Sequence, residues 1–97
     1  MKIELHPGAE RDLEEAAAFY ALEGSPALAA RFLGEFERLA RLLADNPGLG
    51  TPRTRGRLGF PTRGFPYTVI YRPLQTGIRV LVIKHDRRHP GHGGARL

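Results

Sequence analysis

The segment Ile78–His85 constrains the fold more than any other part of the chain. It is rich in β-branched and other apolar residues, which is typical of a β-strand. In strict alternation, its two faces carry Ile78, Val80 and Val82 on one side and Arg79, Leu81, Ile83 and His85 on the other. Because apolar side chains stand on both faces, we expect a central strand with neighbours along both of its edges.

A second strand is predicted over Phe65–Arg72, directly upstream. Alternation gives it one face with Phe65, Tyr67, Val69 and Tyr71 and another with Thr68, Ile70 and Arg72. Pro66 must lie at the start of this strand, because proline cannot donate a hydrogen bond inside a ladder. Pro73–Gly77 then reads as the turn that joins the two strands.

Two further strands are expected earlier in the chain. Lys2–His6 alternates apolar and charged residues, as a short strand does. The segment Gly48–Gly64 is rich in Gly, Pro and Arg and reads mostly as loop. Within it, Arg53–Leu58 is the stretch that fits the first strand of a hairpin.

Two helices are predicted between these strands. Apolar residues recur at helical spacing over residues 7–22, with Pro7 at the first helical position and Gly24 as the stop. Ser25 and Pro26 then form a second start signal, an N-cap followed by a first-turn proline. A broad apolar stripe follows until Asn46-Pro47-Gly48 ends the helix. The short connection indicates an antiparallel helical hairpin.

The element order is therefore β-α-α-β-β-β, which predicts an α+β fold. We expect a small, antiparallel-rich sheet covered on one face by the helical hairpin. A chain of 97 residues has room for one such core, so residues 1–97 are expected to form a single domain. There is no apolar run approaching ~20 residues and no apolar signal region, so we expect a cytoplasmic protein without a membrane span. The chain has no Cys and therefore no disulfide.

Charge is divided unevenly along the chain. Residues 1–50 hold five Lys/Arg and nine Asp/Glu, a balance of −4, whereas residues 51–97 hold ten and one, a balance of +9. Together they give the net charge of +5. Segregation of this kind indicates a polyanion or an acidic partner for the second half, although a solvated basic surface has the same composition. We expect the later basic residues to gather in one patch.

The tail after the central strand concentrates His and Arg, and three interpretations compete for it. A metal site on His85, His89 and His92 has workable spacing only on a helix, which Pro90 and the tail glycines oppose. We therefore expect no metal and no cofactor. In a nuclease, His85 and His92 would move protons while Arg88 stabilises the charge on the phosphate, so these three are the catalytic candidates.

The third interpretation is a contact surface, which requires only charge and shape. Strand alternation extends this surface upstream through Arg72, and the loop before the strand adds Arg63. The residues predicted to bind the target are Arg63, Arg72, His85, Arg87, Arg88 and Arg96.

The ordered set of these residues resembles the RelE/ParE superfamily of toxins from type II toxin–antitoxin modules, in the branch called plasmid stabilisation proteins. The similarity runs over nearly the whole chain and is carried by Ala9, Asp12, Leu13, Phe19-Tyr20, Phe32, Asn46-Pro47, Phe65-Pro66-Tyr67, Ile70-Tyr71-Arg72, His85, Arg87-Arg88 and Pro90. It implies the β-α-α-β-β-β fold and growth arrest by the free toxin. It also implies a cognate antitoxin that wraps the toxin in a hetero-oligomer.

The superfamily divides by target, and two departures from its nuclease pattern bear on this chain. RelE-type members cleave mRNA on the ribosome, and ParE-type members inhibit DNA gyrase. Thr68 stands where nucleases commonly have an arginine that stabilises phosphate charge, and His92-Gly93 stands where an aromatic pair is common. The resemblance thus predicts a ParE-like gyrase inhibitor, with a RelE-like, ribosome-dependent mRNA endonuclease as the alternative.

Overall fold

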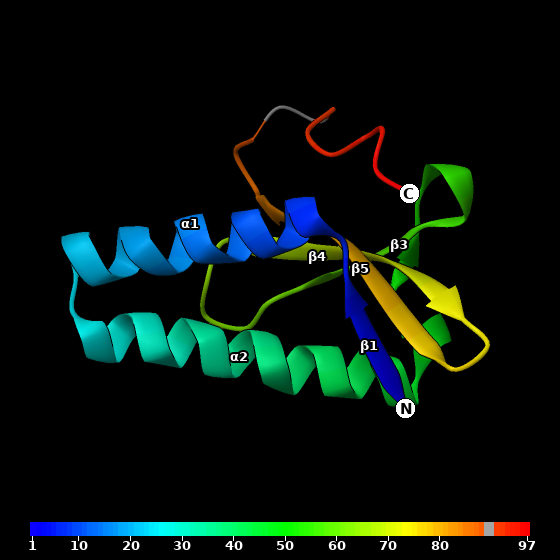
Figure 1. The fold of residues 1–97 in the computed structure, drawn as a ribbon, viewed down its shortest axis with the longest axis horizontal. Coiled ribbons are helices and arrows are strands. Elements are labelled where there is room, and N and C mark those ends of the chain that lie inside the picture. The colour runs from blue at the N-terminus through cyan, green and yellow to red at the C-terminus, as the bar shows by residue number, and fades with distance from the viewer. Residues whose placement is uncertain (89–90) are drawn as a thin grey trace.

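The computed structural model describes residues 1–88 and 91–97, which form two helices and a five-stranded sheet (Figure 1). The α-helices are α1 (Pro7–Glu23) and α2 (Pro26–Asp45). The strands are β1 (Lys2–Leu5), β2 (Thr51–Pro52), β3 (Leu58–Pro61), β4 (Tyr67–Leu74) and β5 (Gly77–His85). Two short 3-10 helices, η1 (Pro47–Leu49) and η2 (Thr54–Gly56), flank β2. The predicted α+β class and element order are confirmed, with β2 as an additional short strand.

The sheet has the strand order β1-β5-β4-β3-β2. β1 runs parallel to β5, and the remaining pairs are antiparallel. β5 therefore has neighbours along both edges, as its two apolar faces predicted. Gly77 opens β5 with φ 153° and lies so close to β1 that an added Cβ would fall 1.8 Å from the Lys2 carbonyl oxygen. Only glycine permits this approach of the two strands.

The helix boundaries follow the signals read from the sequence. α1 begins at Pro7, and α2 begins at Pro26 after Ser25, whose Oγ accepts a hydrogen bond from the Leu28 amide at 3.1 Å. The α2 helix ends at Asp45, directly before Asn46. Figure 1 shows α1 and α2 side by side in opposite directions, so the predicted helical hairpin is present.

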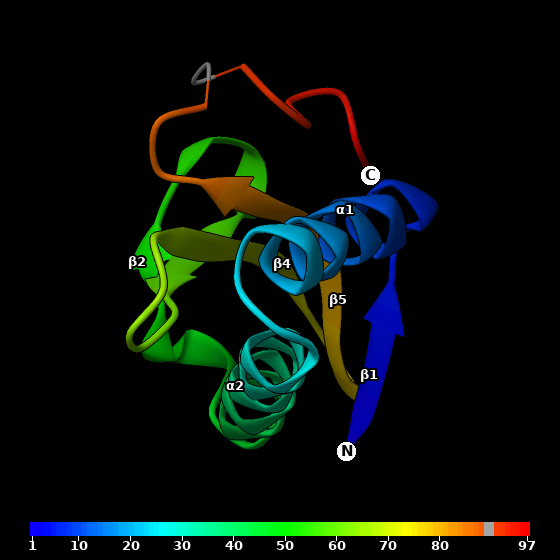
Figure 2. The same cartoon turned by 90° about the vertical axis from the view of Figure 1, so that its left-hand side faces the viewer.

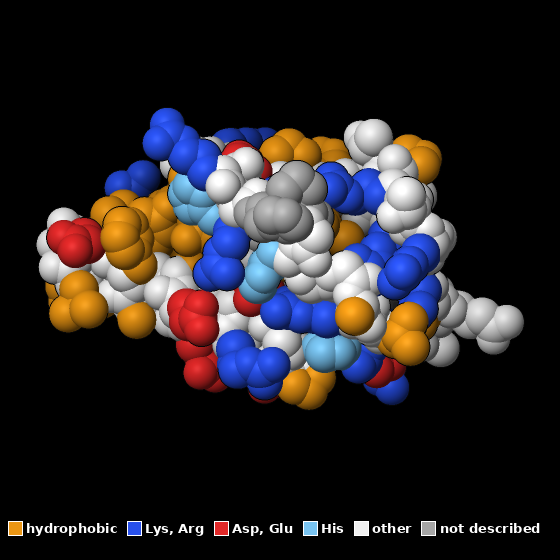
Figure 3. Space-filling view, turned by 90° about the horizontal axis from the view of Figure 1, so that it is seen from above, with side chains coloured by type: hydrophobic (Ala, Val, Ile, Leu, Met, Phe, Trp, Pro, Cys, Tyr) orange, Lys and Arg blue, Asp and Glu red, His pale blue; other side chains and the backbone are white. Residues whose placement is uncertain are grey.

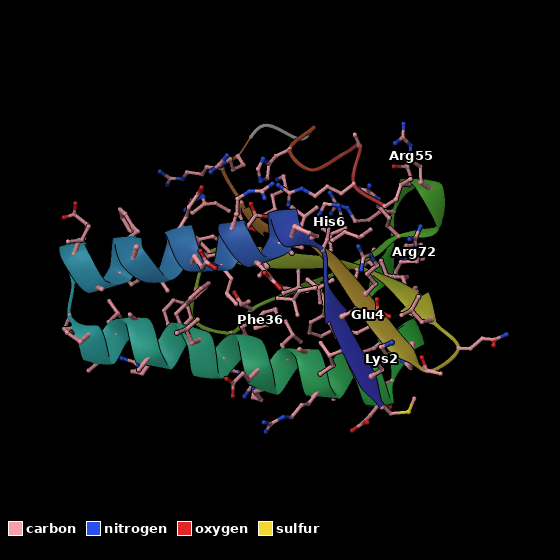
Figure 4. The ribbon with its side chains drawn as sticks, viewed as in Figure 1. Lys2, Glu4, His6, Phe36, Arg55 and Arg72 are labelled. Carbon is pink, nitrogen blue, oxygen red and sulfur yellow. The ribbon has the colours of Figure 1, made fainter. Side chains whose placement is uncertain are left out.

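The main core lies between this hairpin and one face of the sheet. Phe32 of α2 is fully buried and packs against the rings of Tyr20, Phe65 and Tyr67 at centroid distances of 5.1–5.3 Å. Phe36 points from α2 into the same layer (Figure 4). Burial of each large apolar side chain contributes about 1.5–3 kcal/mol, so this layer is the principal source of stability.

A β-bulge changes the face that the end of β5 presents. The pairing with β4 passes from Tyr71–Val80 to Ile70–Val82, so Leu81 is an extra residue on β5. Beyond the bulge, Ile83 joins the helix-covered core, whereas Val82 lies in a separate cluster with Leu81 and Ile70. The predicted alternation was right for Leu81 but wrong from Val82 onward, because an inserted residue shifts every later side chain to the opposite face.

Two other predictions about the strands were wrong about which residues they contain. Pro73 lies inside β4 and pairs with Ile78 of β5, so the turn is shorter than Pro73–Gly77. The pairing of β4 with β3 ends at Tyr71, so Pro73 needs no hydrogen bond to β3. The stretch Arg53–Leu58 is not a strand: it contains η2, and the hairpin strand β3 starts at Leu58.

The second face of the sheet is covered by the C-terminal tail, residues 91–97. Figure 2 shows the tail crossing the sheet on the side away from α2. Gly93, with φ 75°, lies against Val82 so closely that an added Cβ would fall 2.4 Å from a Val82 methyl group. Arg57 is buried beneath the tail and donates hydrogen bonds to the carbonyl oxygens of Gly93, Gly94 and Arg96 at 3.3, 2.9 and 2.5 Å. The tail thereby becomes part of the fold.

Candidate functional site

A pocket of about 310 Å³ opens between α1 and the ends of β4 and β5. Its lining residues are Asp12, Glu15, Ala16, Phe19, Tyr67, Ile83, His85 and Arg88. The β-bulge described above makes this site possible, because it turns Ile83 and the end of β5 toward α1. Two predicted catalytic candidates, His85 and Arg88, thus share one pocket.

The carboxylate of Asp12 lines this pocket and is held in place by several hydrogen bonds. Its side chain is only 6% exposed, and its oxygens accept hydrogen bonds from Arg96 Nη1 at 2.6 Å and from the Ile83 amide at 3.1 Å. Burial raises the pKa of Asp12, but the hydrogen bonds from Arg96, Ile83 and His92 outweigh burial and lower that pKa overall. Asp12 is therefore a paired carboxylate, as a buried charge requires.

His92, the third catalytic candidate, is held between two side chains. Its Nε2 lies 3.1 Å from Asp12 Oδ1, and its Nδ1 lies 3.5 Å from Arg88 Nη1. Because arginine can only donate, the arrangement fits a neutral imidazole that donates from Nε2 and accepts at Nδ1. With both nitrogens engaged, His92 anchors the tail to α1.

His85 lies at the end of β5, with its ring edge-on to Tyr67 at a centroid distance of 5.1 Å. Its Nδ1 accepts a hydrogen bond from the Arg87 amide at 3.1 Å. This contact favours the neutral tautomer with the proton on Nε2. In that state His85 can donate a hydrogen bond to a bound partner.

The electrostatics of the pocket suit a protein partner better than a phosphate. Asp12 and Glu15 both line it, and Arg88 lies 3.8 Å from the Glu15 carboxylate. Asp12 is neutralised by Arg96, but Glu15 is exposed at the rim, and its negative charge disfavours a phosphate group there. Phe19 adds an aromatic ring that is 55% exposed at the same rim. The site therefore combines exposed aromatic surface, a cation and an imidazole donor, which is typical of protein contact surfaces.

The residues predicted to bind the target do not all gather at this pocket. Arg63 lines a different hollow beside α2, where its amide donates to Glu35 at 2.6 Å. Arg72 lies on β4 and contacts the Leu97 carbonyl oxygen. Arg96 is bound to Asp12, and Arg87 is exposed beside His85. Figure 3 shows Lys and Arg side chains spread along the face seen from above. The expected single basic patch is divided.

Asp12 is the residue of this site that reasoning from the sequence missed. Asp12 was named above only among the residues that carry the family resemblance, yet α1 carries it on the buried face with Ala9 and Ala16. Its spacing of three and four residues from these alanines was the available signal. An acidic residue inside an apolar helical stripe needs a partner, and here the partner comes from the tail.

Metal and membrane sites can be assessed only for the described residues, which exclude His89 and Pro90. Within residues 1–88 and 91–97, no three His, Cys, Asp or Glu side chains are placed to hold a metal ion. The expectation about a metal site that involves His89 therefore falls outside the described residues. Neither helix in the described part of the chain is long and apolar enough to cross a membrane.

Comparison with known proteins gives a consistent result for sequence and structure. The family model for the ParE toxin of the type II toxin–antitoxin system parDE matches residues 3–90. Among solved structures, a chain described as the chromosomal ParDE TA system from P. aeruginosa superposes with a TM-score of 0.76. The two are 20% identical, and the similarity covers 88% of this chain and 95% of that chain. At this identity the structural likeness shows the fold. No curated protein matches the chain in sequence.

Proposed function

The chain belongs to the ParE family of toxins from type II toxin–antitoxin systems, and from this membership we propose that it inhibits DNA gyrase. The family match over residues 3–90 is the observation that carries the proposal. The exposed carboxylate of Glu15 beside Arg88 in the α1 pocket supports it, because negative charge next to that arginine disfavours the bound phosphate that an mRNA endonuclease requires. No observation favours the nuclease alternative.

The contact surface for gyrase in this proposal is the rim of the α1 pocket. Arg88 and Arg87 are exposed there, His85 offers a donor, and Phe19 offers an aromatic ring. Arginine and aromatic side chains contribute most strongly to protein–protein binding when a partner excludes water from them. Asp12 and His92 act as positioning residues, because they hold Arg88 and the tail in place.

Supercoiling by purified gyrase, measured with and without purified toxin, tests this proposal. We expect wild-type toxin to inhibit supercoiling and the double variant Phe19→Ala/Arg88→Ala to inhibit it at least tenfold less well. The control is Arg31→Ala/Arg41→Ala, which changes two exposed arginines of α2. Unimpaired supercoiling at saturating wild-type toxin would refute the proposal, and cleavage of translated mRNA by the same preparation would replace it with the nuclease function.

We further propose that a cognate antitoxin neutralises the chain by covering the same rim. Phe19 of α1 lines the pocket that contains Arg88 and is 55% exposed, and Leu22, about one helical turn later, is 85% exposed. An amphipathic, acidic segment fits such a surface, with apolar residues against α1 and carboxylates near the arginines. Phe19→Asp should abolish complex formation with the co-expressed antitoxin, whereas Glu14→Gln, an exposed change on the same helix, should leave it intact. Equal binding of both variants would place the antitoxin elsewhere.

A further inference from the structure

A second pocket, of about 450 Å³, lies on the other side of the tail from the α1 site. One wall is the segment around η2 and the other is the tail. Its lining residues are Arg53, Thr54, Arg55, Arg57, Ile70, Gly91, His92, Gly94 and Ala95. Sequence reasoning placed none of the three arginines at a predicted site, because it treated this segment as a strand or loop.

The arginines of this second pocket divide into a structural one and two that face solvent. Arg57 is 8% exposed, and its guanidinium is occupied by the carbonyl oxygens of the tail. Arg53 and Arg55 are exposed, and Arg55 Nη1 donates one hydrogen bond to the Gly94 carbonyl oxygen at 2.8 Å. An arginine has five N–H donors, so both exposed guanidinium groups keep donors that can bind a ligand. Figure 4 shows Arg55 and Arg72 on the same end of the molecule.

Positive charge in this region is not balanced by nearby acids. No acidic residue lines the second pocket in the described part of the chain, unlike the α1 pocket with its two carboxylates. Burial lowers the pKa of Arg57, and the charges of Arg55, Arg72, Arg53 and Arg96 lower it further. The mutual repulsion of these guanidinium groups is relieved when an anion binds among them, so their arrangement favours anion binding.

The backbone at η2 supports a binding role for Arg55. Its φ of 63° and ψ of 33° are left-handed, a conformation that residues other than glycine rarely adopt, and Gly56 follows with φ 70°. Such strain persists where surrounding contacts enforce it, and it clusters at ligand sites. Here the hydrogen bond to Gly94 fixes the side chain of Arg55 at the mouth of the pocket.

We propose that this second pocket binds phosphate oxygens of a duplex DNA backbone. Arginine forks match the geometry of phosphate oxygens, and the hydroxyl of Thr54 adds a further donor. A backbone contact is favoured over recognition of single strands, because no Phe, Tyr or Trp of the described residues lines the pocket to stack on an unpaired base. The imidazole of His92 also lines it, but that ring is held by Asp12 through a 3.1 Å contact. The site binds without regard to base sequence, since phosphates carry no sequence information.

The test is the affinity of the isolated full-length protein for a fluorescently labelled DNA duplex, measured by anisotropy over a series of salt concentrations. We expect Arg53→Ala/Arg55→Ala to weaken binding at least tenfold and to reduce the slope of log K against log salt by about 1–2. Arg31→Ala/Arg41→Ala removes the same charge from α2 and should retain wild-type affinity. Arg53→Lys/Arg55→Lys keeps the charge and should preserve most of the salt slope.

Three results would overturn the inference: equal weakening by the α2 control, tighter binding of single-stranded RNA or DNA of the same length than of the duplex, or tighter binding of an acidic peptide. A circular dichroism spectrum and a thermal melt of each variant identify any variant that loses its fold. If the alanine variant does so, the salt slope is judged from the lysine variant instead. Gyrase takes no part in this measurement. Failure of the DNA site therefore leaves the proposed gyrase inhibition standing, and the reverse also holds.

Discussion

Asp12 of α1 binds the guanidinium of Arg96, 84 positions later in the chain, through an Oδ2–Nη1 contact of 2.6 Å. The same arginine donates to the Leu81 carbonyl oxygen at 3.1 Å, at the β-bulge of β5. One ion pair thus connects the first helix, the bulge and the tail. Asp12 lines the first pocket, and its other contact, His92, lines the second, so the same carboxylate bears on both candidate surfaces.

Removal of the Asp12 carboxylate should destabilise the protein strongly. Asp12→Ala leaves the guanidinium of Arg96, which is 16% exposed, without its charge partner, and a buried pair that loses one member costs about 3–5 kcal/mol. Because the guanidinium of Arg96 stays partly exposed to solvent, we expect the free energy of unfolding measured in urea to fall by about 2–4 kcal/mol. Glu14→Ala, an exposed change on the same helix, should cost under about 0.5 kcal/mol. A loss below about 1 kcal/mol for Asp12→Ala would show that the pair is not a major constraint.

The pH dependence of stability should report the same contact. The pKa of Asp12 is lower in the folded protein than the unfolded value of about 3.9, so folding favours its charged form. This contribution is complete above the unfolded pKa and is lost as pH falls from there through the folded pKa. The stability difference between wild type and Asp12→Asn should therefore be constant from pH 7 to about pH 5 and shrink on further acidification. A difference that does not change between pH 6 and pH 2.5 would contradict the pKa shift.

The hydroxyl of Tyr71 should account for a measurable part of the stability of the η1 segment. It donates to the Pro47 carbonyl oxygen at 2.7 Å and accepts from the Gly50 amide at 2.9 Å, inside the protein. Tyr71→Phe leaves both backbone groups without a partner, and we expect a loss of about 1–3 kcal/mol in the free energy of unfolding. Tyr20→Phe removes a hydroxyl that makes no hydrogen bond to the described residues, and it should be nearly neutral. Equal costs for the two variants would mean that water replaces the Tyr71 contacts.

The aromatic cluster around Phe32 should dominate the hydrophobic core. Phe32 is fully buried among three rings, so Phe32→Ala creates a cavity and should cost about 3–5 kcal/mol. Phe19→Ala removes the same ring from a position that is 55% exposed and should cost under about 1 kcal/mol. The two costs are compared from the urea midpoints of unfolding, with the same denaturant slope m used for both variants. Similar costs at both positions would place the main core elsewhere.

Elements whose causes are local were predicted well from the sequence. Ser25 and Pro26 define the start of α2 through capping and a fixed φ angle, and both signals lie within two residues. The central position of β5 also followed, because apolar residues on both of its faces must be covered.

Features that depend on contacts between distant segments were not predicted. The bulge at Leu81 arises from pairing with β4, so no local pattern in β5 reports it. The separation of the basic residues has the same origin: Arg96 is drawn to Asp12, Arg57 is buried beneath the tail, and Arg63 lies beside α2. A count of charges along the chain cannot distinguish these destinations.

Inducible expression of the chain without an antitoxin tests the proposed gyrase inhibition most directly, if plasmid topology and mRNA integrity are measured in the same cells. We predict growth arrest with loss of negative supercoiling or accumulation of cleaved DNA, while transcripts remain full-length. Growth arrest with fragmented transcripts and unchanged plasmid topology would contradict that proposal.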